Sequence, residues 1–228
     1  MFAGQGSISC AGPHSCAAGG AYAEGAFRRQ AFVVNEKNGV WRKALRVPGS
    51  AALNLGGGAE VESISCATTG SCAAGGHYTD DAGHYQAFVA NKRKGVWRKA
   101  IPVPGLAGLN RGGMARVYSI SCATATSCAA GGRYLDHAGH RQAFVVNERA
   151  GVWRKAIPVP GLAALNVRGD AKVTSISCAT ARSCAIGGYY GVDAAAGSYK
   201  AFVANETNGV WGNAVEIPSP PGASLAPP

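Results

Sequence analysis

Short apolar segments alternate with polar, glycine-rich turns along the whole chain. In the second quarter of the sequence such segments occupy residues 61–66, 71–78, 85–90 and 96–101. Lengths of about five to seven residues, β-branched and aromatic content, and Gly, Asn, Asp or Pro between the segments are typical of β-strands. Helical periodicity is confined to residues 106–109 and their equivalents, where one turn of helix is expected. The pattern predicts an all-β protein.

The strand pattern repeats with one fixed period. The phrase Ser-Ile-Ser-Cys-Ala occurs four times, and its cysteines at positions 10, 66, 122 and 178 are separated by 56 residues each time (66−10, 122−66, 178−122). A Gly-Gly pair, an Ala-Phe-Val run and a Gly-Val-Trp run recur in step. Because four units of 56 residues account for 224 of the 228, we expect one domain over 1–228, with repeats at approximately 1–56, 57–112, 113–168 and 169–228.

Four strands in each unit favour a ring of radially stacked sheets. Third-strand runs such as residues 31–34 are apolar on both faces, so neighbouring sheets should cover both sides. A sandwich has no reason to keep a strict period, and an open stack would need atypical end repeats, whereas the first and last units here are nearly regular. The sequence therefore predicts a four-bladed β-propeller with four antiparallel strands per blade. The sequence leaves the mode of ring closure open; because the proline-rich tail is a poor ladder donor, packing of whole blades without a shared strand is one way to close it.

The repeat resembles the kelch family. Each unit leads from small apolar residues into Gly-Gly, then an aromatic residue, a tryptophan and a proline-containing link, most clearly in residues 73–78, Trp97 and 102–104. The resemblance implies a propeller blade and a protein-interaction scaffold. The chain departs from kelch proteins in having four units where they usually have more, and in carrying paired cysteines. Residues 35–41 are also similar to turn-and-tryptophan motifs of other propellers, including sugar-cleaving ones, although the spacing to the tryptophan differs.

Eight cysteines form four identical pairs, one in each unit. An even number of cysteines at constant spacing indicates a disulfide framework. Buried free thiols and zinc are the alternatives, but zinc ligand pairs usually lie closer together and no repeated histidine completes a site. Disulfides would place the protein outside the cell, exported with a leader that precedes this sequence. The predicted bridges join Cys10 to Cys16, Cys66 to Cys72, Cys122 to Cys128 and Cys178 to Cys184.

Composition and charge narrow the range of partners. Charged residues make up 15% of the chain and hydrophobic ones 47%, which excludes a disordered chain, and no apolar run approaches the roughly 20 residues of a membrane span. The net charge is +10, and Arg-Lys pairs at 42–43, 98–99 and 154–155 follow the tryptophan in three units. A basic surface of this kind could attract an acidic polysaccharide, although charge also protects an exposed edge strand. No nucleic-acid-binding motif accompanies the charge, so nucleic acid is not the expected partner.

Repeated polar and aromatic residues supply the first set of candidate ligand contacts. A tyrosine follows Gly-Gly in every unit, and a glutamine begins the third strand in three of them. Aromatic rings beside amide groups suit sugars, whose apolar faces stack and whose hydroxyls need donors and acceptors. The alternative is that the rings pack between blades and the amides satisfy loop backbone. These candidates are Tyr22, Tyr78, Tyr134, Tyr190, Gln30, Gln86 and Gln142.

The loops between the second and third strands supply a second set. They vary most between units, and two of them carry acid and imidazole groups that could perform acid–base chemistry if they converged. Asp and His in a glycine-containing loop also commonly cap turns. The serines of the repeat phrase lie within strands and are interpreted as structural. The loop candidates are Asp80, Asp81, His84, Asp136, His137 and His140.

Repetition of the tyrosines and glutamines favours binding over catalysis. We therefore expect a secreted, multivalent carbohydrate-binding module whose partner is a glycan or an acidic polysaccharide, with no cofactor and no metal. The alternatives are a hydrolase or lyase with one site built from the variable Asp/His loops, and a protein-interaction scaffold.

Overall fold

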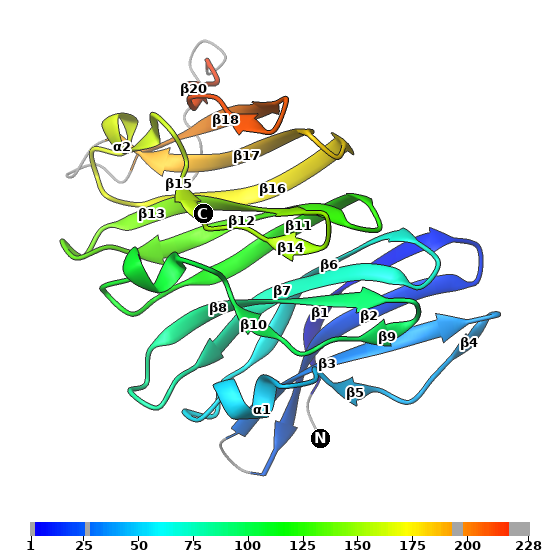
Figure 1. Ribbon diagram of the computed structural model, residues 1–228. Helices are drawn as coiled ribbons and strands as arrows, with labels where there is room; N and C mark the ends of the chain where they lie inside the picture. The colour runs from blue at the N-terminus through cyan, green and yellow to red at the C-terminus, as the bar shows by residue number, and fades with distance from the viewer. Residues whose placement is uncertain (1–2, 26–27, 193–197, 219–228) are drawn as a thin grey trace.

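The computed structural model describes residues 3–25, 28–192 and 198–218, and these residues form four antiparallel sheets arranged in chain order (Figure 1). We number the sheets as blades 1 to 4. The described residues are almost entirely strand and turn, with single helical turns in the links after blades 1, 2 and 3. The all-β fold and the predicted helical turn near residue 106 are therefore confirmed. No described helix has the length and apolar character needed to cross a membrane.

Each blade has three long strands and two very short ones. Blade 1 contains β1 (Ala3–Gly12), β2 (Ser15–Glu24), β3 (Arg28–Lys37), β4 (Val40–Trp41) and β5 (Leu45–Arg46), followed by α1 (Ser50–Leu53). Blade 2 contains β6 (Glu60–Thr68), β7 (Ser71–Thr79), β8 (Tyr85–Arg93), β9 (Val96–Trp97) and β10 (Ile101–Pro102), followed by the 3₁₀ turn η1 (Leu106–Gly108). Blade 3 contains β11 (Arg116–Thr124), β12 (Ser127–Leu135), β13 (Arg141–Arg149), β14 (Val152–Trp153) and β15 (Ile157–Pro158), followed by α2 (Leu162–Leu165). Blade 4 contains β16 (Ala171–Thr180), β17 (Ser183–Gly191), β18 (Tyr199–Thr207), β19 (Val210–Trp211) and β20 (Val215–Glu216).

The fourth strand of each blade is divided, where the sequence predicted one continuous strand over residues 96–101. In blade 2, β9 and β10 both pair with β8, but the residues between them leave the ladder. The Ala100 N–H donates instead to the Pro48 carbonyl in the link from blade 1, at 2.7 Å. Equivalent bonds join Ala156 to Pro104 and Ala214 to Pro160. A bond to the preceding link therefore replaces a bond within the sheet.

The serines of the repeat phrase join neighbouring blades. The first strands β1, β6, β11 and β16 pack side by side, which leaves one edge of each strand facing the next. The Ser7 and Ser9 hydroxyls accept hydrogen bonds from the Ile64 and Cys66 N–H groups at 3.2 and 3.0 Å. The same two bonds recur at the next two junctions. These bonds satisfy backbone donors at the strand edges, which supports a structural role for the serines.

The cysteine pairs are disulfides. Each bridge joins directly opposed residues of the first hairpin of a blade, with 3.9 Å between the α-carbons of the Cys66–Cys72 pair. The other three pairs have the predicted partners as well, and no free cysteine occurs among the described residues. Four disulfides indicate folding in an oxidising environment such as the cell exterior.

The hydrophobic core lies between the blades. Three apolar clusters fill the junctions between blades 1 and 2, 2 and 3, and 3 and 4. The outward faces of the first and last blades carry the same residue types without a described neighbour: Ile8 is 62% exposed where Ile64 is 4%, and Val203 is 37% exposed where Val145 is 0%. Burial between neighbouring sheets, more than within any one sheet, therefore stabilises the fold.

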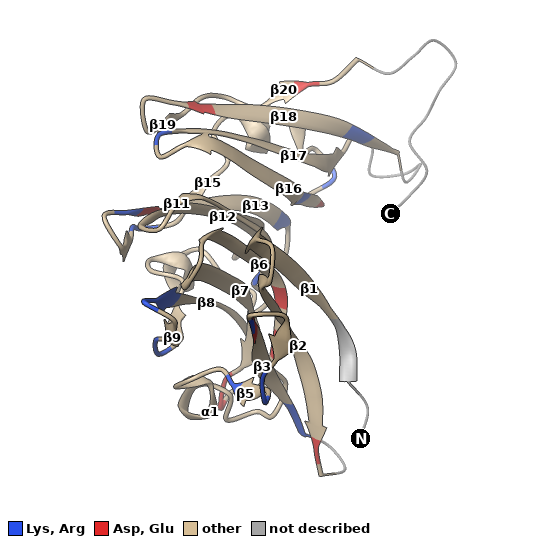
Figure 2. Cartoon of the chain, turned by 90° about the vertical axis from the view of Figure 1, so that its right-hand side faces the viewer, with Lys and Arg blue, Asp and Glu red and all other residues tan. Residues whose placement is uncertain are grey.

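Blades 1 and 4 share no extensive contact among the described residues. The two blades lie at opposite ends of the row, blue and red in Figure 1, and Figure 2 shows the successive sheets between them. The extensive contacts between first strands all join consecutive blades. The four blades are therefore those predicted, and the described residues arrange them as a row.

Candidate functional site

The repeated tyrosines and glutamines are paired across the central hairpin of each blade. Tyr78 lies opposite Gln86 on β7 and β8, and Tyr134 lies opposite Gln142 on β12 and β13. The tyrosine rings are packed into the fold: Tyr78, Tyr134 and Tyr190 are buried, and Tyr22 is half-buried. Burial raises the pKa of Tyr134 above its ordinary value, and the nearby Asp136 carboxylate adds to this effect. The tyrosine therefore remains a neutral phenol that supplies mainly an apolar wall.

The glutamines connect an asparagine on one side to a carboxylate on the other. In blade 3 the Asn166 side chain donates to the Gln142 Oε1 at 3.2 Å, and the Gln142 Nε2 donates to the Asp136 Oδ2 at 3.1 Å. In blade 2 Asn110, Gln86 and Asp80 make the same contacts at 3.1 and 3.0 Å. These networks hold the glutamine and the carboxylate in fixed orientations beside the tyrosine.

Asp136 and Asp80 also cap the hairpin turns that follow them. The Asp136 Oδ1 accepts the His140 N–H at 2.8 Å, and Asp80 accepts the His84 N–H at the same distance. Burial acts to raise the pKa of Asp136, but the hydrogen bonds from the His140 backbone and the Gln142 side chain outweigh it, and the pKa lies below its ordinary value. The same balance, with Gln86 and His84 as donors, lowers the pKa of Asp80. Both carboxylates are therefore ionised at neutral pH.

The tyrosine, glutamine and carboxylate of blade 3 line one pocket. Its volume is about 240 Å³, and Tyr134, Asp136 and Gln142 share its wall with Ala143, Pro158, Val159, Leu162 and Ala163. Sequence reasoning placed the tyrosine and the aspartate in separate hypotheses. The structure brings them together because the aspartate lies two residues beyond the tyrosine, at the end of the same hairpin. Blade 2 has the same residue types at the equivalent positions.

In blades 1 and 4 the residue equivalent to Pro158 of the pocket wall is charged and forms an ion pair. The position of Pro102 and Pro158 is Arg46 in blade 1, where the guanidinium pairs with Glu24 at 2.6 Å. It is Glu216 in blade 4, which pairs with the Lys200 ammonium at 2.7 Å and accepts a hydrogen bond from the Tyr190 hydroxyl. Gln30 donates to Glu24 in the same network of blade 1. These two blades therefore offer charged groups that are already partnered.

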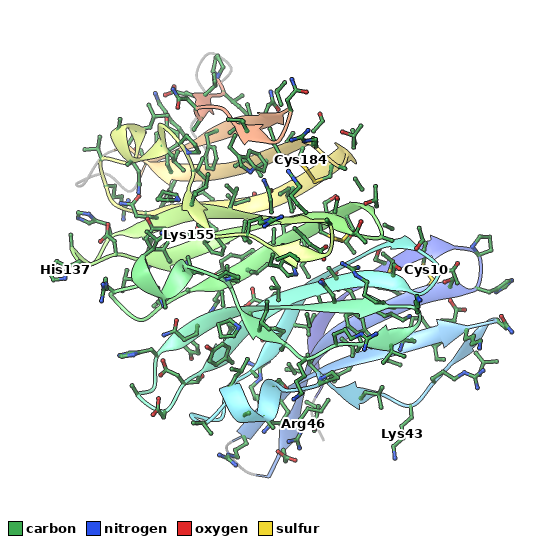
Figure 3. The ribbon with its side chains drawn as sticks, viewed as in Figure 1. Cys10, Lys43, Arg46, His137, Lys155 and Cys184 are labelled. Carbon is green, nitrogen blue, oxygen red and sulfur yellow. A yellow bond between two sulfur atoms is a disulfide. The ribbon has the colours of Figure 1, made fainter. Side chains whose placement is uncertain are left out.

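The remaining loop candidates do not converge. Asp81, His84, His137 and His140 are exposed. Figure 3 shows His137 on the opposite side of the molecule from Cys10 and Cys184, which mark the disulfide ends of blades 1 and 4. His84 and His140 lie 3.8 Å from the aspartates of their own loops. Among the described residues no group of three acidic, histidine or cysteine side chains is arranged to hold a metal ion. Each of the two loops therefore holds its own aspartate and histidine, and the two loops do not share a site.

A second series of pockets lies at the outer edge of the junctions, and sequence reasoning missed it. The pockets between blades 2 and 3 and between blades 3 and 4 measure about 190 and 170 Å³, and each is lined by an Arg-Lys pair with a tryptophan of the next blade. The pocket between blades 1 and 2 measures about 500 Å³. Figure 2 shows Lys and Arg beside β9, at the edge of blade 2. The repeat pattern identified the Arg-Lys pairs and the tryptophans, but the sequence does not show that those of neighbouring blades meet in one pocket.

Two solved structures share this architecture. The chain is similar to the Hadza microbial sialidase Hz136, with a TM-score of 0.59 and 9% identity over 91% of this chain and 45% of that protein. It is also similar to a subtype N11 neuraminidase-like protein of A/flat-faced bat/Peru/033/2010 (H18N11), with a TM-score of 0.52 and 12% identity over 95% of this chain and 54% of that protein. The fold is a β-propeller. No family model matches the chain, and no curated protein matches it.

These similarities define the fold and leave the activity open. The propeller spans about half the length of the two solved structures. Identities of 9% and 12% show shared architecture alone. The propeller prediction is confirmed, whereas the kelch assignment finds no support.

Proposed function

We propose that this propeller is an extracellular glycan-binding module with two equivalent sites. The sites are the Tyr134, Asp136 and Gln142 pocket of blade 3 and its counterpart at Tyr78, Asp80 and Gln86 in blade 2. The observation that carries the proposal is the convergence of these three residue types on one pocket. In blades 1 and 4 ion pairs occupy the position, so the proposal is restricted to the two central blades.

The chemistry of the pocket suits a sugar. Pro158, Val159 and Leu162 give it an apolar wall, on which the face of a sugar ring can pack. A carboxylate offers about four acceptor positions, and Asp136 uses some of them for its turn and for Gln142. Its side chain remains 25% exposed, so acceptor capacity is left for a sugar hydroxyl. A volume of about 240 Å³, below the usual range of roughly 300–1,000 Å³ for ligand pockets, suits a single sugar unit.

Duplication compensates for the weakness of a small site. Two sites held on neighbouring blades can engage two units of one glycan, and linkage of this kind increases avidity by about 10²–10⁴-fold over a single site. The net charge of +10 favours encounter with acidic glycans. The names of the two similar structures, a sialidase and a neuraminidase-like protein, are consistent with a propeller that handles carbohydrate.

One carboxylate in the pocket favours binding over glycoside cleavage. Most glycosidases use two carboxyl groups that flank the scissile bond, and sialidases use a tyrosine nucleophile instead. Tyr134 is buried and its pKa is raised, which disfavours the phenolate that such a nucleophile needs. The described wall of the blade 3 pocket contains Asp136 as its single acidic side chain. We therefore expect glycans to be bound and released unchanged.

A glycan array followed by calorimetry tests the proposal. The wild-type protein should bind one glycan class. Asp80→Asn or Asp136→Asn alone should lose most of the avidity on the array, and the double variant should lose binding of uncharged glycans, which have no carboxylate for a second, cationic site. Asp81→Asn is the matched control, because Asp81 is the exposed neighbour of Asp80 and should behave as wild type. Absence of binding to every neutral and acidic glycan, or a double variant that binds as wild type, would refute the proposal. Release of cleaved sugar from a bound glycan would favour the hydrolase or lyase alternative.

A further inference from the structure

Two of the three blade junctions bury a carboxylate in the same way. Between blades 2 and 3, Glu148 is fully buried and accepts a hydrogen bond from the Asn91 side chain at 2.7 Å while it pairs with the Arg93 guanidinium. Between blades 3 and 4, Glu206 is held by Asn147 at 2.7 Å and by Arg149. An asparagine and an arginine on the third strand of one blade therefore hold a glutamate on the third strand of the next.

The first junction has the holding groups without the glutamate. Asn35 and Lys37 on β3 occupy the positions of Asn91 and Arg93, and the Asn35 Oδ1 accepts the Trp97 indole N–H at 3.2 Å, as Asn91 does from Trp153 at 3.1 Å. The position of Glu148 on β8 is Lys92. With lysine in place of glutamate, the Asn35 amide has no carboxylate to donate to. The junction also gains a second cation beside Lys37.

Lys92 is a largely buried residue that lines this junction, and its ammonium group has no counter-charge among the described residues. The residue is 7% exposed, and no described carboxylate lies within ion-pair distance of it. Burial lowers the pKa of Lys92 below its ordinary value. A buried cation without a partner is costly, and Lys37 is a like charge at the same junction. An anion bound there would remove both penalties.

A pocket is present at this junction. Its volume is about 500 Å³, and its wall contains the cationic residues Lys37, Arg42, Lys92 and Lys94 against one acidic residue, Glu36. Uncharged polar residues, among them Asn35 and Asn38, make up much of the rest of the wall. The volume lies within the roughly 300–1,000 Å³ of ordinary ligand pockets, and the charge selects an anion.

We propose that the pocket between blades 1 and 2 binds a carboxylate of an acidic polysaccharide, such as a uronic acid unit, through Asn35, Lys37 and Lys92. The bound carboxylate replaces the glutamate that the other two junctions carry in their own chain, which is why a carboxylate is favoured. A glycan source rests on the proposed function, and the pocket has room for a sugar ring. This site is separate from the tyrosine pockets, because it is built from the disulfide end of blades 1 and 2.

Titration calorimetry with glucuronate and an oligogalacturonate tests the site. Lys92→Glu recreates the arrangement of the other junctions, so it should fold at least as stably as wild type and weaken oligogalacturonate binding by about 30-fold or more. Lys92→Met removes the cation alone and should also weaken binding. Lys43→Gln removes one positive charge from an exposed position outside the pocket, and binding should stay within about twofold of wild type.

The outcomes separate this site from the glycan pockets of blades 2 and 3. The double variant Asp80→Asn, Asp136→Asn should retain oligogalacturonate binding at Lys92 even if binding at the tyrosine pockets is lost. Unchanged affinity of Lys92→Glu overturns the site. Tighter binding of an oligoglutamate peptide than of oligogalacturonate overturns the glycan source, and equal binding of inorganic sulfate overturns the preference for carboxylate.

Discussion

The Trp153 indole N–H donates to the Asn91 Oδ1 across the junction between blades 2 and 3, at 3.1 Å. Asn91 in turn donates to Glu148, so one asparagine connects a tryptophan and a buried carboxylate of the next blade. Trp97 and Trp211 make the same bond to Asn35 and Asn147 at 3.2 and 3.3 Å. The tryptophan of the repeat therefore holds each blade to the one before it.

Replacing the repeat tryptophan should destabilise the fold where the residue lies in a junction between blades. The same replacement in blade 1, where the tryptophan lies on an uncovered face, should have little effect. Trp153 is 6% exposed, and Trp153→Ala should lower the free energy of unfolding by about 3–5 kcal/mol. Trp41, on the uncovered face of blade 1, is 45% exposed, and Trp41→Ala should cost about 1 kcal/mol or less. Urea unfolding of both variants measures the difference. Equal losses would show that blade 1 is covered in solution.

Gly131 and Gly187, at equivalent positions in the second strands of blades 3 and 4, give a second matched comparison. A β-carbon on Gly131 would lie 2.5 Å from the Val173 Cγ1 of the next blade, so Gly131→Ala should push blades 3 and 4 apart and cost about 1–3 kcal/mol. Gly187 occupies the same position on the free face of blade 4, and the nearest atom to its added β-carbon is 3.9 Å away. Gly187→Ala should be neutral or stabilise by up to about 1 kcal/mol, because it restricts the unfolded chain. Thermal unfolding measured side by side tests both, and a destabilised Gly187→Ala would contradict the interpretation.

The strands could be predicted from the sequence because each depends on local alternation and turn residues. The disulfides followed from spacing, since Cys66 and Cys72 face each other across one hairpin. The division of the fourth strand could not be foreseen, because Ala100 bonds to Pro48 on a different blade. The same holds for Lys92, whose importance emerges only when the structure shows which residues face it. The contact between the end blades could not be predicted, because regular first and last units fit a closed ring and a row of identical blades equally well.

Removal of one disulfide should cost a modest amount, whereas reduction of all four should unfold the protein. A bridge between residues six positions apart restricts a short loop of the unfolded chain, which is worth about 2 kcal/mol in the chain-entropy model. The variant Cys66→Ala, Cys72→Ala should lose about that amount and keep its β-sheet circular dichroism. Loss of all four bridges, on the order of 8 kcal/mol, approaches the usual total stability of a domain, about 5–15 kcal/mol. A fully reduced protein with an unchanged unfolding midpoint would contradict this expectation.

Asp136 should make the stability depend on pH in the acid range. Its pKa in the fold lies below its ordinary value of about 3.9, so the carboxylate stabilises the fold above about pH 4, and this contribution is lost as the pH falls through the folded pKa. Asp136→Asn should therefore be less stable than wild type at pH 7, by about 1 kcal/mol after allowance for partial exposure.

The difference between wild type and Asp136→Asn should shrink toward zero as the pH falls below about 4, because both side chains are then neutral. Urea unfolding at pH 7, 5 and 3 measures it, with the exposed Asp81→Asn as the control. A difference that stays constant from pH 7 to 3 would mean that the carboxylate charge does not stabilise the turn at residues 136–140. In that case His140 and Gln142 would bind an amide as well as they bind the carboxylate, and the fixed negative charge proposed for the glycan pocket would lose its structural basis.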